Sequence, residues 1–149
     1  MSTLLEIKHL KKYFYVPAGT NHAVDDVTMR IQKGKTMGVV GESGCGKSTL
    51  GRTMIRLHDP TDGQILLDGQ DITNVKGREL KKIRERMQII FQDPYASLNP
   101  RYSMDEVIRE PLKEARRFSR QEIDERVQEL MDREGIEERL RYAYPHELD

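Results

Sequence analysis

The sequence predicts a mixed α/β fold: a strand, loop and helix core suited to phosphate binding, an antiparallel N-terminal β part and a helical appendage. Between Leu4 and Phe91, short apolar or alternating segments are separated by Gly, Pro and Asp, which is typical of strands and turns. After Tyr102 the pattern changes to helix-capping residues followed by apolar positions at helical spacing. With 149 residues, the chain is about the size of one domain.

Composition excludes several classes of protein. Twenty-five Lys and Arg balance 25 Asp and Glu, so no net positive field favours nucleic acid or an anionic membrane. A single cysteine cannot form an intramolecular disulfide, which is typical of a reducing compartment. The apolar runs are far shorter than the roughly 20 residues of a membrane-spanning helix, and residues 1–11 do not resemble a signal peptide. We therefore expect a chain that is neither secreted nor membrane-spanning.

Five segments are predicted as strands. Residues 4–8, 27–31, 64–67 and 87–91 are apolar or alternating, and turn residues bracket the third of them. Residues 36–40 form a short run without alternation, which predicts a strand buried on both faces.

Two helix starts are marked by capping boxes, in which a serine and a glutamate three residues later satisfy free amides at the helix N-terminus. These pairs are Ser103 with Glu106 and Ser119 with Glu122. After the second pair, apolar residues fall on one stripe of a helix, and a glycine suits its C-terminal cap. The stripe and cap residues are Ile123, Val127, Leu130, Met131 and Gly135. Pro111 is expected to end or kink the shorter helix before it.

A phosphate-binding loop is predicted at residues 41–48, which read Gly-Glu-Ser-Gly-Cys-Gly-Lys-Ser and fit the pattern G-x-x-x-x-G-K-[ST]. Its glycines allow backbone N–H groups to surround phosphate, and the helix N-terminus that follows adds positive potential. Lys47 is expected to meet the β and γ phosphates, and the Ser48 hydroxyl to bind Mg²⁺. The alternative is a glycine-rich turn that binds nothing. Cys45 is interpreted as a small residue tolerated at a free position, without a redox role.

Three segments in this order and spacing resemble the ATP-binding subunit of an ABC transporter: the loop with its preceding strand, residues 60–65, and residues 89–94. The stretches 92–101 and 144–148 are similar to those of dipeptide and oligopeptide importers, and the resemblance covers essentially the whole chain. It implies an incomplete P-loop NTPase fold, with residues 1–102 as the β part and core and residues 103–149 as part of a helical subdomain. It also implies ATP and Mg²⁺ as cofactors, bound in part by Gly41, Glu42, Ser43, Gly44, Cys45, Gly46, Lys47, Ser48 and Thr49.

The resemblance assigns two further residues. Gln92 would bind Mg²⁺, help to hold the attacking water and act in catalysis with Lys47. The alternative for Gln92 is a polar residue that ends an apolar strand. Phe14 matches the aromatic position that stacks on adenine, although Tyr13 and Tyr15 compete for it and strand aromatics are ordinarily packing residues.

The family also implies partners and a location. The helical subdomain would dock on transmembrane permease subunits, beside a second ATPase subunit, at the cytoplasmic face of the membrane. The alternative for the charged surface of this subdomain is plain solvated surface. The four histidines have no Cys or His partner at metal-binding spacing, which argues against a metal site.

The 149 residues end where the family continues into its Ser-Gly-Gly-Gln signature, and no apolar run ending in Asp-Glu follows Gln92. We therefore expect a truncated fragment that binds ATP but hardly hydrolyses it, whereas the parent family hydrolyses ATP to drive peptide import. The alternative is a non-catalytic nucleotide-binding module that associates with itself through exposed sheet edges. A P-loop kinase or GTPase is disfavoured, because no Asn-Lys-x-Asp motif occurs.

Overall fold

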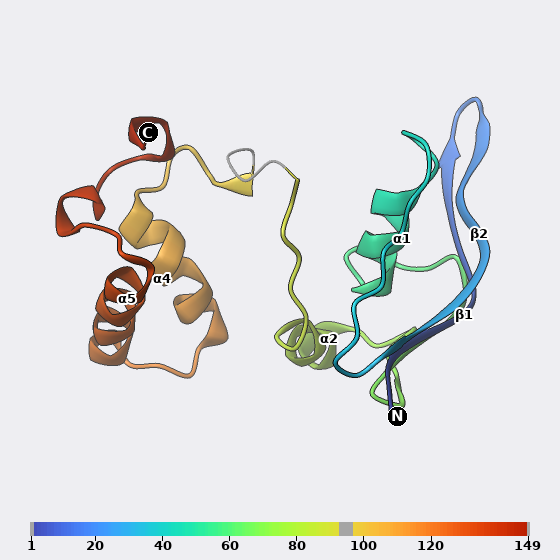
Figure 1. The fold of residues 1–149 in the computed structure, drawn as a ribbon, viewed down its shortest axis with the longest axis horizontal. Coiled ribbons are helices and arrows are strands. Elements are labelled where there is room, and N and C mark those ends of the chain that lie inside the picture. The colour runs from blue at the N-terminus through green and yellow to red at the C-terminus, as the bar shows by residue number, and fades with distance from the viewer. Residues whose placement is uncertain (1, 93–96, 149) are drawn as a thin grey trace. The chain divides into compact units, whose positions relative to one another are not determined.

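The computed structural model describes residues 2–92 and 97–148, and the chain divides into two compact units, Met1–Ile89 and Ile90–Asp149. Figure 1 shows an antiparallel sheet with helices α1 (Lys47–Met54) and α2 (Gly77–Arg84) in the first unit, and helices α4 (Met104–Ala115) and α5 (Arg120–Glu134) in the second. Residues 93–96 of the family-like stretch 92–101, and Asp149, lie outside the described residues. Within the described part, no helix is both long enough and apolar enough to cross a membrane.

The sheet of the first unit is built on a long hairpin. Strands β1 (Thr3–Val16) and β2 (Gly19–Gln32) pair antiparallel. Strand β3 (Asp62–Leu67) pairs with the other edge of β1, and the short β4 (Gln70–Asp71) pairs with β3. The order is therefore β2-β1-β3-β4, and all pairs are antiparallel. The strands predicted at 4–8, 27–31 and 64–67 are confirmed, and β1 and β2 extend well beyond the predicted segments.

Helix α1 (Lys47–Met54) contributes Leu50 to the core of this unit, and α2 (Gly77–Arg84) contributes Ile83. Sequence reasoning missed α2, although Leu80, Ile83 and Met87 are spaced as on one face of a helix. The buried core residues come from the strands and both helices, and removing their side chains from water is the main stabilising contribution. They are Leu5, Ile7, Leu10, Val24, Leu50, Ile65, Leu67, Ile72 and Ile83.

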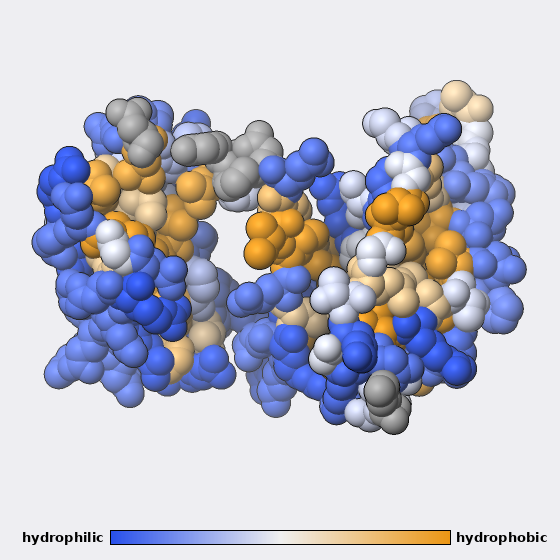
Figure 2. All heavy atoms as spheres, viewed as in Figure 1, coloured by the Kyte–Doolittle hydropathy of each residue, from blue (hydrophilic) through white to orange (hydrophobic). Residues whose placement is uncertain are grey.

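Two predicted strands are wrong. Residues 36–40 and 87–91 are outside every helix and strand that the structure describes. Val40 is 94% exposed and Ile90 is 95% exposed, and Figure 2 shows hydrophobic surface on the segment that follows α2. An apolar run shows that a segment is suited to burial, but a strand also needs a neighbouring strand for its hydrogen bonds. Neither segment has such a neighbour among residues 2–92 and 97–148.

The second unit contains α4 (Met104–Ala115) and α5 (Arg120–Glu134), followed by the short 3-10 turns η1 (Glu138–Leu140) and η2 (Pro145–Glu147). Both predicted capping boxes are confirmed, with the serine hydroxyl accepting from the glutamate N–H and the glutamate carboxylate accepting from the serine N–H. The left-handed cap at Gly135 and the buried stripe positions Ile123, Val127 and Met131 are confirmed as well. Leu130, also predicted for the stripe, is only partly buried and is not part of this apolar cluster.

Pro111 does not end its helix, because α4 continues to Ala115, and the alternative expectation, a kink at Pro111, stays a prediction. Proline removes only one backbone donor from a helix, the one that would bond four residues back. The neighbouring apolar residues Ile108 and Leu112 pack on the α5 stripe, and this packing holds the helix on both sides of the proline.

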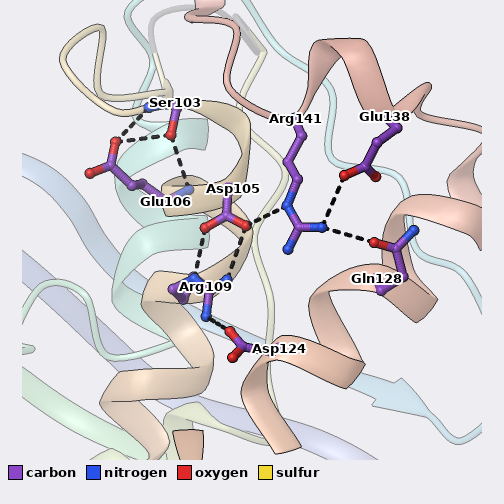
Figure 3. A network of polar contacts seen from close by, with 8 residues as sticks. All are labelled: Ser103, Asp105, Glu106, Arg109, Asp124, Gln128, Glu138 and Arg141. Carbon is purple, nitrogen blue, oxygen red and sulfur yellow. Dashed lines mark hydrogen bonds and ion pairs between the residues drawn. The ribbon is translucent and has the colours of Figure 1, made fainter. Parts of the chain in front are cut away.

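A polar network joins the elements of the second unit (Figure 3). The carboxylate of Asp105, which is only 7% exposed, accepts two hydrogen bonds from Arg109, at 2.7 and 3.0 Å, and one from Nε of Arg141, at 2.9 Å. Arg109 also pairs with Asp124 of α5, and Arg141 donates to Gln128 of α5 at 2.8 Å. Hydrogen bonding by Arg109 lowers the pKa of Asp105, despite the opposing effect of burial. One buried carboxylate therefore links α4 to α5 and to the turn η1.

Candidate functional site

The glycine loop is held against the β hairpin. Gly46 precedes α1 with a left-handed backbone, φ 95°, and a Cβ atom on it would lie 2.1 Å from the carbonyl oxygen of Ala23 in β2. Only glycine combines this conformation with this close approach. The residue type at the sixth position of the motif is thus required by the contact between loop and sheet.

Lys47 is the first residue of α1, and its side chain folds back over the loop. Its Nζ donates to the carbonyl oxygens of Gly41, at 2.9 Å, and Glu42, at 2.6 Å, and lies 3.6 Å from Sγ of Cys45. Two adjacent backbone carbonyls at the start of the loop therefore fix the ammonium group over it, where an anion in the loop would meet a positive charge.

The N-terminus of α1 adds to this positive potential. It has no side-chain cap and no acidic residue in its first turn, so no carboxylate neutralises the free N–H groups of residues 47–49.

At the other end of α1, the buried Arg56 donates to the carbonyl oxygens of Ile72, at 3.0 Å, and Val75, at 3.1 Å. Burial lowers the pKa of Arg56, and Asp59 partly opposes this shift by pairing with it. These bonds fix α1, and with it the loop, on the connection between β4 and α2.

A hollow of about 350 Å³ joins the loop to the hairpin. From the loop and α1 it is lined by Gly44, Cys45, Gly46, Lys47, Ser48 and Thr49, and from the hairpin by Phe14, Asn21, His22 and Ala23. The structure thus brings Phe14 together with six of the predicted loop residues. The first three, Gly41, Glu42 and Ser43, do not line the hollow. Gln92 belongs to the second unit, and its role at this site stays a prediction.

The three competing aromatic residues of β1 differ in their surroundings. Phe14 lines the hollow and meets the His58 ring edge-on at 5.6 Å. Tyr13 stacks on His22 and donates its hydroxyl to Asp25, a hydrogen bond that raises the pKa of Tyr13 to about 12. Tyr15 is 76% exposed and does not line the hollow. The position of its ring therefore favours Phe14 as the residue that contacts a ligand.

Sequence reasoning missed the β2 side of the hollow, Asn21 to Ala23. These residues lie beside Phe14 because the hairpin register pairs Phe14 with Asn21 and Tyr13 with His22, and no local pattern in the sequence indicates that register. Among the residues that the structure describes, no group of three or more His, Cys, Asp or Glu side chains could hold a metal ion.

Comparisons with known proteins agree with the fold and the loop. A family model described as ABC transporter matches residues 24–148. The chain is 47% identical to the oligopeptide transport ATP-binding protein AppF of Bacillus subtilis, over 98% of this chain and 47% of AppF. It is 48% identical to the oligopeptide transport ATP-binding protein OppF of Escherichia coli, over 96% of this chain and 43% of OppF.

Two solved structures are similar as well. The dimeric ATP-binding cassette MJ0796 bound to ADP and Pi superposes with a TM-score of 0.78 at 28% identity, over 98% of this chain and 63% of that one. The structure of cbiO1 from Clostridium perfringens, part of the ABC transporter complex cbiONQ, gives a TM-score of 0.72 at 29% identity, over 100% of this chain and 57% of that one.

The antiparallel sheet, the glycine loop and the helix that follows it define a partial ATP-binding cassette fold. The chain belongs to the ABC transporter family. It is similar over nearly its whole length to the ATP-binding proteins of oligopeptide transport, and it spans about half the length of the curated relatives it matches.

Proposed function

We propose that this chain is the ATP-binding segment of an ABC ATPase that couples ATP binding and hydrolysis to peptide import. The observation that carries the proposal is the hollow in which Phe14 and the glycine loop meet. One side offers a ring for a base, and the other offers Lys47, free N–H groups and a positive helix end for phosphates. The relatives named as oligopeptide transport ATP-binding proteins support peptide as the transported substrate.

The residues of the loop suit Mg-ATP. Gly46 allows the loop to approach the carbonyl oxygen of Ala23, where any side chain would collide, and Lys47 and the helix N-terminus supply positive charge. Ser48 and Gln92 carry oxygen atoms, the ligands that Mg²⁺ prefers, and we assign both to the metal. When bound, Mg²⁺ would neutralise phosphate charge. Lys47 would hold the γ phosphate, and Gln92 would orient the attacking water.

Hydrolysis by the 149-residue chain itself is expected to be slow. Phosphoryl transfer depends on positioned groups that stabilise charge and orient water. After Gln92, no apolar run of this sequence ends in the Asp-Glu pair that would supply a carboxylate. We therefore propose binding with little turnover, and a steady-state rate of about 1 per second or more would contradict this.

The same proposal includes partners and location. We assign transmembrane permease subunits as the docking partners of the helical unit, and a second ATPase subunit as the partner that completes the site. Related cassettes of known structure, two described as dimeric and one as part of an ABC transporter complex, support this assignment. The chain would then work at the cytoplasmic face of the membrane, held there by protein contacts.

A second candidate function is a non-catalytic nucleotide-binding module that self-associates. The exposed apolar segments 36–40 and 87–91 favour it, because extended apolar segments without a strand neighbour tend to pair with another chain. Size-exclusion chromatography with light scattering tests this candidate. A well-folded monomer over a wide concentration range would contradict it.

Calorimetric titration with Mg-ATP tests the first proposal, after circular dichroism has shown that each variant is folded. The parent chain should bind, and Lys47→Ala should weaken binding about tenfold or more, because hydrogen bonds to charged groups contribute about 1.5–3 kcal/mol. Lys76→Ala is the matched control, since Lys76 is exposed, precedes α2 and does not line the hollow. A folded parent chain that does not bind Mg-ATP would contradict the proposal.

A further inference from the structure

Another hollow of the first unit, of about 520 Å³, lies against helix α2 and is called the α2 hollow below. Its charged lining consists of Arg78 and Lys82, one helical turn apart on α2, Arg86 in the turn that follows the helix, and Glu79. It is separate from the hollow at the glycine loop, which other residues line. Three positive charges and one negative charge therefore surround a space that the proposed function does not use.

Most of this positive charge is not neutralised within the protein. The side chains of Arg78 and Lys82 are exposed, and neither forms a hydrogen bond or an ion pair with residues 2–92 or 97–148. Arg86 lies 3.8 Å from Asp68, but that carboxylate already binds Lys33 at 2.6 Å, and the Arg86 side chain stays 48% exposed. The α2 hollow therefore has positive charge available for an outside partner.

The position of α2 is fixed without these three side chains. Ile83, which is 3% exposed, belongs to the core of the first unit, and Arg84 donates to the carbonyl oxygen of Arg56. These two contacts determine which side of α2 packs inward, and Arg78 and Lys82 remain in solvent. A partner would thus meet a helix that is already in place, which lowers the entropy cost of binding.

We propose that the α2 hollow is a docking surface for an acidic α-helix of a partner protein. One helical turn separates Arg78 from Lys82, about 6 Å along the axis, and carboxylates at every fourth position of a second helix have the same spacing. Gln70 and Glu79, which also line the hollow, can bind amide and basic groups, and a protein helix carries such groups among its carboxylates. An anionic bilayer is flat and presents phosphates, which suit neither a hollow nor Glu79.

The test titrates the full chain into a fluorescein-labelled, alanine-rich peptide of about 20 residues with glutamate at every fourth position, and follows fluorescence anisotropy. The peptide should bind at low salt, and a peptide with glutamine at the same positions should bind about tenfold more weakly, because its ion pairs are lost. Binding of the glutamate peptide should disappear near 1 M salt, where the screening length is about 3 Å.

Reversing the charge of the α2 hollow gives the sharper readout. Arg78→Glu combined with Lys82→Glu should weaken the glutamate peptide about tenfold and create binding of a peptide with lysine at those positions, a gain that unfolding cannot produce. Lys35→Glu combined with Arg101→Glu is the matched control. These two exposed residues lie outside the α2 hollow, and their reversal changes the net charge equally, so neither peptide should bind differently.

Three outcomes would overturn the inference. The first is equal affinity for the glutamate and glutamine peptides, and the second is an equal loss in the two double variants after circular dichroism has shown that both are folded. The third is a parent chain that does not bind the glutamate peptide at low salt. If such a chain binds phosphatidylglycerol vesicles instead, the surface serves a membrane and not an acidic helix.

Discussion

The backbone of Gly46 packs against the carbonyl oxygen of Ala23, so closely that a methyl group on Gly46 would lie 2.1 Å from that oxygen. This contact joins the glycine loop to strand β2, and the hollow that contains Phe14 and His22 lies along the same junction. The nucleotide affinity that we propose for this site should therefore depend on the contact between loop and hairpin as well as on the loop sequence.

Gly46→Ala should abolish binding of Mg-ATP, because the new side chain collides with backbone and its φ of 95° is strained for any residue other than glycine. Calorimetric titration measures the loss. Gly51→Ala is the control within α1: its Cβ would meet open space, and the change should stabilise the helix by about 1 kcal/mol without loss of affinity. Equal affinities of the Gly46→Ala and parent chains would show that the loop does not need this contact.

Arg56→Met should destabilise the first unit by about 2 kcal/mol, because the carbonyl oxygens of Ile72 and Val75 would lose a charged donor in a mostly buried setting. Urea unfolding followed by circular dichroism measures the change. For comparison, Arg78→Gln removes an exposed positive charge on α2 and should change the free energy of unfolding by less than about 0.5 kcal/mol. Similar losses of unfolding free energy in the two variants would mean that the buried hydrogen bonds of Arg56 stabilise the first unit no more than an exposed positive charge does.

Asp105→Asn should destabilise the second unit by about 3 kcal/mol, because Arg109 and Arg141 would keep their largely buried charges without the carboxylate that bridges them. Amide hydrogen exchange of α4 and α5 reports the loss for this unit alone. Glu110→Gln is the matched control on α4, where the side chain is exposed and outside the network, and should leave the exchange unchanged. If α4 and α5 keep their protection in Asp105→Asn, the network is not what holds them together.

Acidification should act through the same carboxylate. The folded pKa of Asp105 is lowered below the ordinary value of 3.8, mainly by its hydrogen bonds from Arg109. Its contribution to stability is therefore complete above that ordinary value and is lost as the pH falls through the lower folded pKa. We expect the free energy difference between the parent chain and Asp105→Asn to be constant at neutral pH and to shrink at pH values below 3.8. A difference that stays constant down to the acid-unfolded state would contradict this linkage.

Sequence patterns predict the features of this protein that depend on residues a few positions apart, and they predict poorly those that depend on residues far apart in the chain. The capping boxes at Ser103 and Ser119 and the glycine cap at Gly135 are interactions between residues a few positions apart, so their residue types alone predict the helix ends. The hairpin of β1 and β2 was only partly predicted, because strand lengths depend on the partner as well as on local pattern. Its register, which brings His22 to Tyr13, has no local signal.

The sequence by itself determined the glycine loop, with its lysine and serine at fixed spacing, and the family that this loop indicated. Only the tertiary structure decided that residues 36–40 and 87–91 lie outside the sheet. It also decided that Arg56 holds the end of α1 by buried hydrogen bonds, and that Phe14 rather than Tyr15 lines the hollow. The physical reason is that a motif needs only local backbone conformations. A strand, a buried charge or a pocket wall exists only through partners that lie far away in the sequence.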